Sequence, residues 1–385
     1  VAAYDAASAD ACPTGGVALL HARLLHAHGG RMKWEQFRYG PIDGLLWMAA
    51  GRAYLAAVRN GLSRRGVMLY PSASVETTPE AEYLKVLTFH AASMDSLLPI
   101  EIEIAERLIA HFLPRFTLTE QACTESVYWV DAAKPLPPTR LAKLPEPSPT
   151  LRFFGTGQAI EAVSELRAHV EQAGELPPSI NLGGQYAPHV VLPVLDHLAL
   201  CWAPKPPTRA HGRHFVKSRL AIVNGLPNIH RRLSGLEIDP DFEEIWVAEN
   251  VSLGGMGAEV RLAGNDWVRV GAPLGIQPDG GDNWLIGVIR RFSRETESVG
   301  SVGIETISKS PRAIEADGAG LTTQGILLDP LVVGGQVRIL VPTADWEESI
   351  PLLLSLDDTK ARLLPLETIE HGDGFALGRY RVEAI

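Results

Sequence analysis

Hydrophobic positions in the first part of the chain recur at helical spacing. Residues 41–60 are expected to form a helix, because a proline suits the first turn of a helix and Gly61 suits its end. A second helix is expected to start at residues 78–80, and a third is expected to be capped by Ser96. The apolar stripe of that third helix consists of Ile100, Ile104, Leu108 and Phe112. Such faces must be buried, and we expect these helices to pack against one another.

Proline then interrupts the helical pattern. Six prolines lie between residues 134 and 149, which predicts an extended linker over residues 135–150. After it, residues 151–154 are expected to form a short strand, and Thr156 is expected to start a helix. A further apolar helix is predicted at residues 190–202.

Beyond a second group of prolines at positions 204, 206 and 207, the pattern changes to short β-rich runs separated by glycine turns. These runs predict the antiparallel strands of a small barrel. Near the C-terminus, a hairpin is expected around residues 371–374. The sequence leaves open whether this last region adds a β-layer to the barrel or forms a separate module.

The expected fold class is therefore α+β and multidomain. The predicted parts are a helical domain (1–134), a Pro-rich linker (135–150), an α/β connecting segment packed with the helical region (151–203), a small antiparallel β-barrel (204–312) and a β-rich C-terminal extension (313–385). A chain of 385 residues is too long for one hydrophobic core, which agrees with several domains.

Composition narrows the class of protein. The net charge of -10 argues against nonspecific nucleic-acid binding, which needs a broad basic surface. Cys12, Cys123 and Cys201 are far apart and form no C-x-x-C pair, so a reducing, cytoplasmic compartment is expected without a thiolate metal site. No apolar run reaches about 18 residues, and no membrane span is expected.

One stretch reverses the sign of the charge. Residues 205–236 contain seven Lys or Arg, three His and no Asp or Glu. A local excess of cations in an acidic chain is typical of a site for an anion. It also has a simpler interpretation, in which an exposed segment pairs with the acidic run at residues 237–249.

A second pattern follows the strand-like residues 245–247. It reads Asn250-Val251-Ser252-Leu253-Gly254-Gly255, an N-x-S-x-x-G run. Small polar side chains followed by glycine at the end of a strand allow a flat ligand to approach the backbone closely.

These two elements together resemble the PilZ domain, a bacterial receptor module for cyclic di-GMP. Its R-x-x-x-R motif is matched by Arg209 and Arg213, while Arg213 and Lys217 give an alternate register that ends in Lys. The stretches 284–291 and 301–305, the second of which reads S-V-G-I-E, resemble later strands of that family. The resemblance covers residues 205–312.

The resemblance implies a cytoplasmic receptor with no chemistry of its own and no cofactor besides its ligand. The residues expected to bind cyclic di-GMP are Arg209, Arg213, Lys217, Asn250, Ser252 and Gly255. A guanidinium can form paired hydrogen bonds with the O6 and N7 edge of guanine, which Lys does less well. The helical N-terminal region is expected to bind a protein partner and to pass the signal on by domain rearrangement.

Two alternatives remain open. In the first, the barrel has lost its ligand and serves as a protein-interaction scaffold. In the second, the glycine turn at residues 155–157 binds a nucleotide cofactor for an enzyme, although the third glycine of that motif is replaced by Ile160. The phosphate-binding and hydrolase motifs that we sought are absent from the sequence, and His21, His26 and His28 lack a neighbouring carboxylate that would complete a metal site.

Overall fold

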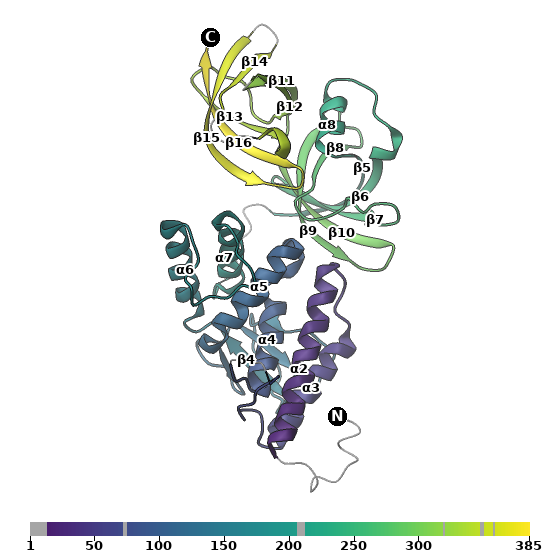
Figure 1. Ribbon diagram of the computed structural model, residues 1–385. Coiled ribbons are helices and arrows are strands. Elements are labelled where there is room, and N and C mark those ends of the chain that lie inside the picture. The colour runs from purple at the N-terminus through teal and green to yellow at the C-terminus, as the bar shows by residue number, and fades with distance from the viewer. Residues whose placement is uncertain (1–13, 72–74, 206–211, 319, 347–349, 357–358) are drawn as a thin grey trace. The chain divides into compact units, whose positions relative to one another are not determined.

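The computed structural model describes residues 14–71, 75–205, 212–318, 320–346, 350–356 and 359–385. The chain divides into two compact units, Val1–Thr208 and Arg209–Ile385, each considered by itself below. We call them the helical unit and the barrel unit. Figure 1 shows that helices dominate the first and strands the second. The predicted fold class, a helical N-terminal region followed by antiparallel β-structure, is confirmed.

The helical unit buries one continuous apolar core. Its helices are α2 (Thr14–Phe37), α3 (Gly44–Arg59), α4 (Pro79–Ala91), α5 (Pro99–Phe112), α6 (Ala159–Ala173) and α7 (Pro188–Trp202). Leu87, Leu108 and Trp202 are fully buried in the same cluster, although they come from three different helices. The helices thus pack against one another, as amphipathic faces require.

Two expected helix starts need comparison with the structure. The hydroxyl of Thr78 accepts a hydrogen bond from the backbone N–H of Ala81 at 3.0 Å, so α4 begins where the sequence predicted. Ser96 does not cap α5, because it lies in a single 3-10 turn, Met94–Ser96. The carboxylate of Glu101 accepts a bond from the N–H of Leu98 at 2.8 Å instead, and the helix starts at Pro99.

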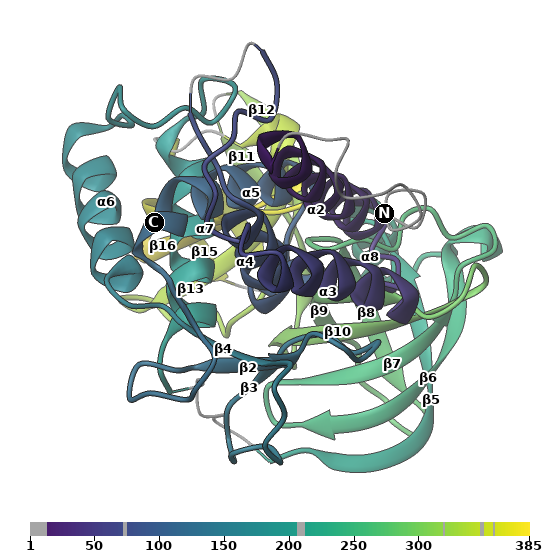
Figure 2. The same cartoon turned by 90° about the horizontal axis from the view of Figure 1, so that it is seen from below.

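The helical unit also contains a small antiparallel sheet, which the hydrophobic periodicity of the sequence predicted only in part. Its strands are β1 (Thr117–Thr119), β2 (Tyr128–Asp131), β3 (Thr139–Arg140) and β4 (Leu151–Gly155), in the order β1-β4-β2-β3. Figure 2 shows β4, β2 and β3 side by side. Only β4 was expected.

The proline-rich stretch is part of this unit, whereas the sequence predicted a linker over residues 135–150. It contains β3, a two-residue edge strand, which is a position that proline-rich backbone tolerates. From β3, the guanidinium of Arg140 donates to the carbonyl oxygens of Cys201 at 2.6 Å and Ala203 at 2.7 Å. A cation at the C-terminus of a helix is favourable, so Arg140 stabilises the end of α7.

The first barrel of the barrel unit is closed. Its strands are β5 (His214–Asn224), β6 (Glu243–Ser252), β7 (Gly255–Arg261), β8 (Pro273–Pro278), β9 (Leu285–Arg294) and β10 (Val299–Ser308), in the order β10-β7-β6-β5-β8-β9. All neighbouring pairs are antiparallel. A short helix, α8 (Leu226–Leu233), connects β5 to β6.

The C-terminal region forms a second closed barrel, which answers the question that the sequence left open. Its strands are β11 (Arg312–Gly318), β12 (Leu321–Leu327), β13 (Gln336–Pro342), β14 (Leu352–Leu356), β15 (Thr359–His371) and β16 (Phe375–Ala384), in the order β11-β12-β13-β16-β15-β14. The expected hairpin around residues 371–374 joins β15 to β16. This barrel has its own buried cluster, with Ile339, Leu363 and Val382 at its centre.

The two barrels also share a core. Ile286 and Val288 of β9 are buried against Ile326 and Phe375 of the second barrel, and Ile229 of α8 joins the same cluster. Each fully buried side chain of this size stabilises the fold by about 1.5–3 kcal/mol.

Ion pairs surround that shared core. The guanidinium of Arg269 donates to both carboxylate oxygens of Asp373, at 2.5 and 2.6 Å, and Arg290 pairs with Glu370. The barrels therefore fold as one body, fixed by apolar burial and by paired charges.

Changing Gly51 to Ala should destabilise the helical unit, although alanine is the better helix former. A Cβ at Gly51 would lie 1.9 Å from the carbonyl oxygen of Ala132, so α3 would have to move away from the chain after β2. We expect Gly51→Ala to lower the free energy of unfolding by about 1–3 kcal/mol. Urea titration followed by far-UV circular dichroism measures the change.

The matched control is Gly30→Ala in α2. A Cβ at Gly30 meets no atom of the described residues within 4 Å. This change should stabilise the unit by up to about 1 kcal/mol through helix propensity alone. Equal effects of the two substitutions would contradict the contact assigned to Gly51.

Candidate functional site

A cavity of about 720 Å3 opens at one end of the first barrel. At this end β5, β7 and β9 begin, and β6, β8 and β10 end. Apolar side chains such as Leu220, Met256 and Leu285 line its inner part. Its size is that of a pocket for a small organic ligand, and its apolar lining with few polar groups is typical of such pockets.

The polar lining of this cavity has one sign of charge. It consists of Lys309, His214 and the hydroxyl-bearing residues Ser218, Ser252 and Thr306. Among the described lining residues there is no Asp or Glu. In a protein of net charge -10, a carboxylate-free cavity with a lysine at its rim favours an anionic ligand.

Two β-bulges lie opposite each other beside this cavity. The register of β5 against β6 shifts between Phe215 and Ser218, and that of β6 against β7 shifts between Ala248 and Asn250. Bulges commonly redirect side chains next to functional sites. Here they place Asn250 next to Phe215 across the strands and expose Lys217.

The N-x-S-x-x-G run forms the turn between β6 and β7. Ser252 lines the cavity, and its hydroxyl donates to the carbonyl oxygen of Gly255 at 3.1 Å. The amide of Asn250 lies over Gly257, where an added Cβ would be only 2.6 Å from its Nδ2. The Oδ1 of Asn250 is buried and has no hydrogen-bond donor among the described residues. An unpaired buried acceptor costs about 1–3 kcal/mol, but Asn250 itself is not among the residues that line the cavity.

Packing within the protein explains why position 255 is a glycine, which the sequence did not reveal. A Cβ at this position would lie 2.1 Å from the carbonyl oxygen of Ile304 in β10. The glycine therefore permits the close pairing of β7 with β10. We had expected it to leave room for a ligand, and the backbone alone already requires it.

The expected cations are distributed unevenly. Arg213 is exposed directly before β5, between Gly212 and His214, which both line the cavity. Lys217 is exposed in the β5 bulge and is not one of the lining residues. Neither side chain forms an ion pair with a described residue. Arg209 lies outside the described residues.

Part of the basic stretch is neutralised within the barrel unit. Arg232 of α8 pairs with Glu243 at 2.5 Å, and Arg231 donates to the carbonyl oxygen of Glu237 at 2.8 Å. The simpler interpretation, in which the acidic run pairs with the basic stretch, thus holds for Arg232, whereas Arg231 meets only a backbone carbonyl. It does not account for Arg213 at the cavity.

The stretches that resemble later PilZ strands form the neighbouring pair β9 and β10. Arg290 of β9 donates to Glu305 of β10 at 2.7 Å and also pairs with Glu370. Burial alone would lower the pKa of Arg290, but its hydrogen bonds to these carboxylates raise it. The glutamate of V-G-I-E therefore holds the strands together and does not line the cavity.

Four polar lining residues were not among the predicted site residues: His214, Ser218, Thr306 and Lys309. The last two reach the cavity only because β10 closes the barrel beside β7. The backbone N–H of Thr306 donates to the carbonyl oxygen of Gly254 at 3.0 Å, which fixes the end of β10 against the β6–β7 turn. No local sequence pattern predicts that β10 closes the barrel beside β7.

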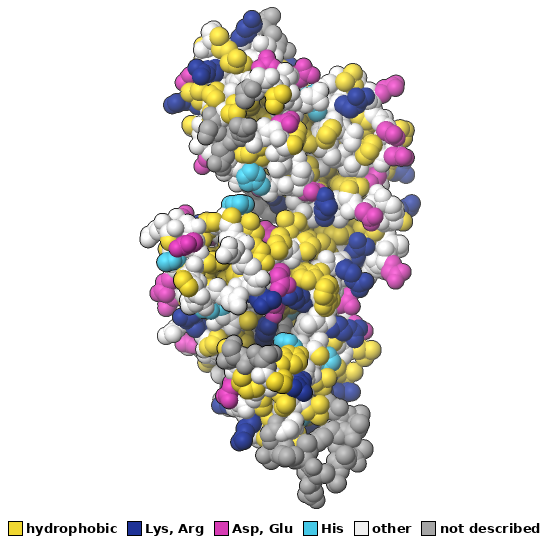
Figure 3. Space-filling model, in the orientation of Figure 1, with side chains coloured by type: hydrophobic (Ala, Val, Ile, Leu, Met, Phe, Trp, Pro, Cys, Tyr) yellow, Lys and Arg dark blue, Asp and Glu magenta, His cyan; other side chains and the backbone are white. Residues whose placement is uncertain are grey.

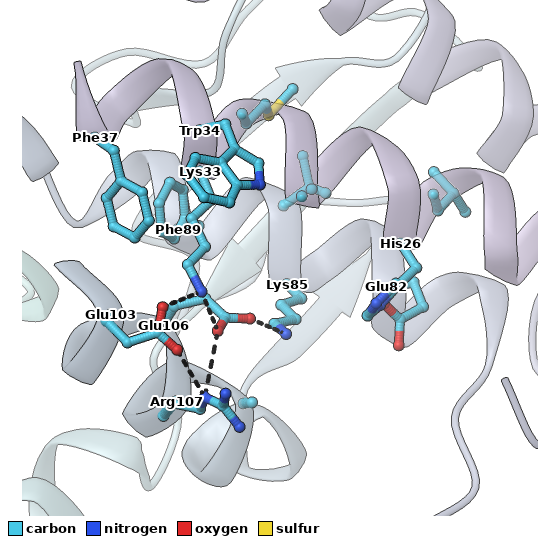
Figure 4. A pocket seen from close by; sticks show the side chains of 16 residues that line it. His26, Lys33, Trp34, Phe37, Glu82, Lys85, Phe89, Glu103, Glu106 and Arg107 are labelled. Carbon is cyan, nitrogen blue, oxygen red and sulfur yellow. Dashed lines mark hydrogen bonds and ion pairs between the residues drawn. The ribbon is translucent and has the colours of Figure 1, made fainter. Parts of the chain in front are cut away.

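The helical unit has a cavity of about 510 Å3 between α2, α4 and α5 (Figure 4). Lys33 pairs with Glu103 and Glu106, and Lys85 also pairs with Glu106. These charges compensate one another, so this cavity offers no surplus charge to an ionic ligand. Trp34 at its edge is 68% exposed. On the face seen in Figure 3, hydrophobic side chains of this unit lie among charges of both signs.

The three N-terminal histidines do not form a metal site among the described residues, where no cluster of metal-ligating side chains occurs. His26 has a carboxylate neighbour that the sequence did not indicate: its Nδ1 lies 3.0 Å from Glu82 of α4. His21 is buried in α2. Burial and the charge of Arg31 lower the pKa of His28.

The turn at residues 155–157 has a structural explanation. A Cβ at Gly155 would lie 1.9 Å from the carbonyl oxygen of Glu125, and Gly157 has a φ of +45°. The following helix starts at Ala159, later than the predicted Thr156. These glycines serve backbone packing, which removes the feature on which the cofactor interpretation was based.

One Cys–His pair, Cys201 and His197 of α7, invites comparison with a catalytic pair. Their Sγ and Nε2 atoms are 3.6 Å apart. However, the Nε2–H of His197 donates to the carbonyl oxygen of Ala92 at 2.5 Å, so this nitrogen is not free to accept a proton. Burial raises the pKa of the Cys201 thiol to about 11 and lowers that of His197.

Within the described part of the chain, no helix is both long enough and apolar enough to cross a membrane.

Cys201 should resist alkylation while Cys123 reacts. At about pH 8, a thiol of such raised pKa is almost entirely protonated, and the thiolate is the nucleophile. A hydrogen bond with Ser126 lowers the pKa of the exposed Cys123. Iodoacetamide labelling followed by peptide mass spectrometry should show Cys201 modified far more slowly than Cys123. Similar rates for the two thiols would identify Cys201 as an activated nucleophile.

Comparison with known proteins gives a match to a family model and a match to a solved structure. Residues 1–122 match the family model described as "Cyclic-di-GMP receptor FimW, N-terminal domain". No curated protein matches the chain. A structure described as that of the Borreliella burgdorferi PlzA protein in complex with c-di-GMP is 10% identical, with a TM-score of 0.18, over 44% of this chain and 86% of that one. That similarity is too low to establish a shared fold.

Proposed function

We propose that this protein is a receptor for cyclic di-GMP, which binds at the open end of the first barrel. The observation that carries the proposal is the cavity beside the N-x-S-x-x-G turn, whose described lining contains Lys309 and no carboxylate. Such a lining suits a ligand with two phosphates and two planar bases, because the phosphates need cations and the bases need apolar surface.

Support comes independently from the helical unit. The family model that matches residues 1–122 describes the N-terminal domain of a cyclic di-GMP receptor. Those residues precede every residue of the proposed site, so the match and the cavity are separate observations. As the resemblance to PilZ domains implies, the receptor is proposed to act in the cytoplasm and to carry out no reaction.

Arg209 is assigned by the resemblance to PilZ domains, and the other binding residues are assigned partly by position. Arg209 and Arg213 hold guanine or phosphate, and Ser252, at the end of the neighbouring strand β6, contributes a hydroxyl. Asn250 does not line the cavity and is kept as a binding residue because of the resemblance to PilZ domains; its buried, unpaired Oδ1 would accept a ligand N–H only after the β6–β7 turn had moved. Arg213 and Lys217 each lie between two lining residues without lining the cavity themselves, and we favour the Arg209 and Arg213 register because a guanidinium can form paired hydrogen bonds with guanine, which Lys does less well.

We further propose that ligand capture changes the arrangement of the two units. Arg209 is the first residue of the barrel unit, so the arginine pair follows the helical unit directly in sequence. The helical unit would pass this change to a protein partner.

Titration calorimetry on the full chain tests binding. Cyclic di-GMP should bind, and Arg213→Ala should weaken binding by about 1–3 kcal/mol because a forked contact to guanine or phosphate is lost. Ser252→Ala should weaken it by about 0.5–1.5 kcal/mol through the loss of a hydroxyl contact.

Arg261→Ala is the matched control, since Arg261 is exposed at the other end of β7 and should not affect affinity. Absence of heat with the unmodified protein would refute the receptor and favour the scaffold interpretation.

Small-angle X-ray scattering tests the rearrangement. The scattering profile of the full chain should change at saturating cyclic di-GMP, and Arg213→Ala should shift the change to higher ligand concentration. An unchanged profile in the presence of calorimetric binding would remove the rearrangement and leave the receptor intact.

A further inference from the structure

The segment that joins the two barrels is held by the second barrel. It consists of the last two residues of β10, Ile307 and Ser308, and the residues that follow them before β11. The buried hydroxyl of Ser308 donates to the carbonyl oxygen of Leu328 at 2.6 Å. The guanidinium of Arg338 donates to the carbonyl oxygen of Ile307 at 3.1 Å. Both partners belong to the second barrel.

The arginine that anchors this segment is itself fixed. Its Nε and Nη2 donate to the two carboxylate oxygens of Asp329 at 2.9 and 2.7 Å, and the backbone N–H of Arg338 donates to the same carboxylate at 2.9 Å. A forked pair of this kind fixes both position and orientation. The second barrel thus presents a rigid support to Ile307 and Ser308.

Between these anchors and β11, Lys309 lines the cavity of the first barrel. Its ammonium forms no ion pair with a described residue, and it is the one lysine or arginine among the described lining residues. The hydrogen bond from Thr306 to Gly254 places the end of β10 against the turn that carries Ser252. Lys309 therefore lies on the β10 side of the cavity, while Arg213 precedes β5.

We infer that Lys309 is a further ligand-binding residue of the same site, which binds a phosphate of the dinucleotide and is positioned by the second barrel through Ser308. The inference rests on the proposed function. A lysine ammonium is a compact charge well suited to phosphate, whereas the arginines suit the guanine edge. Lys309 lines the cavity and Arg213 lies beside it, between the lining residues Gly212 and His214, which suits a ligand that carries two phosphates. The second barrel thereby becomes part of the binding site without touching the ligand.

Calorimetry with cyclic di-GMP on the full chain tests the contact. Lys309→Gln should weaken binding about tenfold, the effect of losing one hydrogen bond to a charged group. Lys309→Arg keeps the charge and should retain most of the affinity. Lys360→Gln is the matched control, because Lys360 is an exposed lysine of β15 in the second barrel, outside the cavity lining. Added salt should weaken binding less in Lys309→Gln than in the unmodified protein.

A double-mutant cycle tests the positioning role of Ser308. Ser308→Ala should weaken binding about threefold when Lys309 is present and should have no effect in Lys309→Gln, because Ser308 acts through Lys309. Thermal unfolding of each variant checks that the barrel unit remains folded. Equal losses in both backgrounds would overturn the positioning role.

The outcomes separate this inference from the proposed function. If the unmodified protein binds cyclic di-GMP and Lys309→Gln binds equally well, the role of Lys309 is refuted and the receptor stands. If the unmodified protein does not bind, both fall.

Discussion

The apolar core shared by the two barrels is the constraint on which the rest of the barrel unit depends. Ile286 and Val288 of β9 point out of the first barrel, where an isolated barrel would expose them, and they are buried only because the second barrel covers them. Their burial fixes β9, and β9 with β10 closes the ring. The cavity exists because that ring is closed. The cavity thus depends on a contact remote from the N-x-S-x-x-G turn.

A second feature of the barrel unit is that several of its carboxylates form ion pairs with arginines outside the cavity. Glu305 and Glu370 are engaged by Arg290, Asp373 by Arg269, and Glu243 by Arg232. None of these carboxylates lines the cavity at the open end of the barrel, and no other Asp or Glu of the described residues does. An acidic protein can therefore present a cationic cavity without an overall basic surface.

Much of the architecture could be predicted from hydrophobic periodicity and from the positions of glycine and proline. Helices with an apolar stripe and strands separated by glycine turns have local sequence signatures. The start of α4 at Thr78 and the β15–β16 hairpin are examples. The predictions that failed concern residues whose roles depend on contacts with distant parts of the chain. The role of Gly255 depends on a carbonyl in β10, and that of the proline-rich stretch on the end of α7. Lys309 joins the cavity through barrel closure, which no window of sequence contains.

The shared core also has a consequence for dissection of the protein. A fragment that ends where the family resemblance ends, near residue 312, would include α8 and β9 but not the strands that cover them. Ile229, Ile286 and Val288 would then meet water together, forming the kind of exposed apolar patch that promotes self-association. The stretch that resembles a known family is thus shorter than the stretch that can fold by itself. The smallest piece suited to isolation is the whole of Arg209–Ile385.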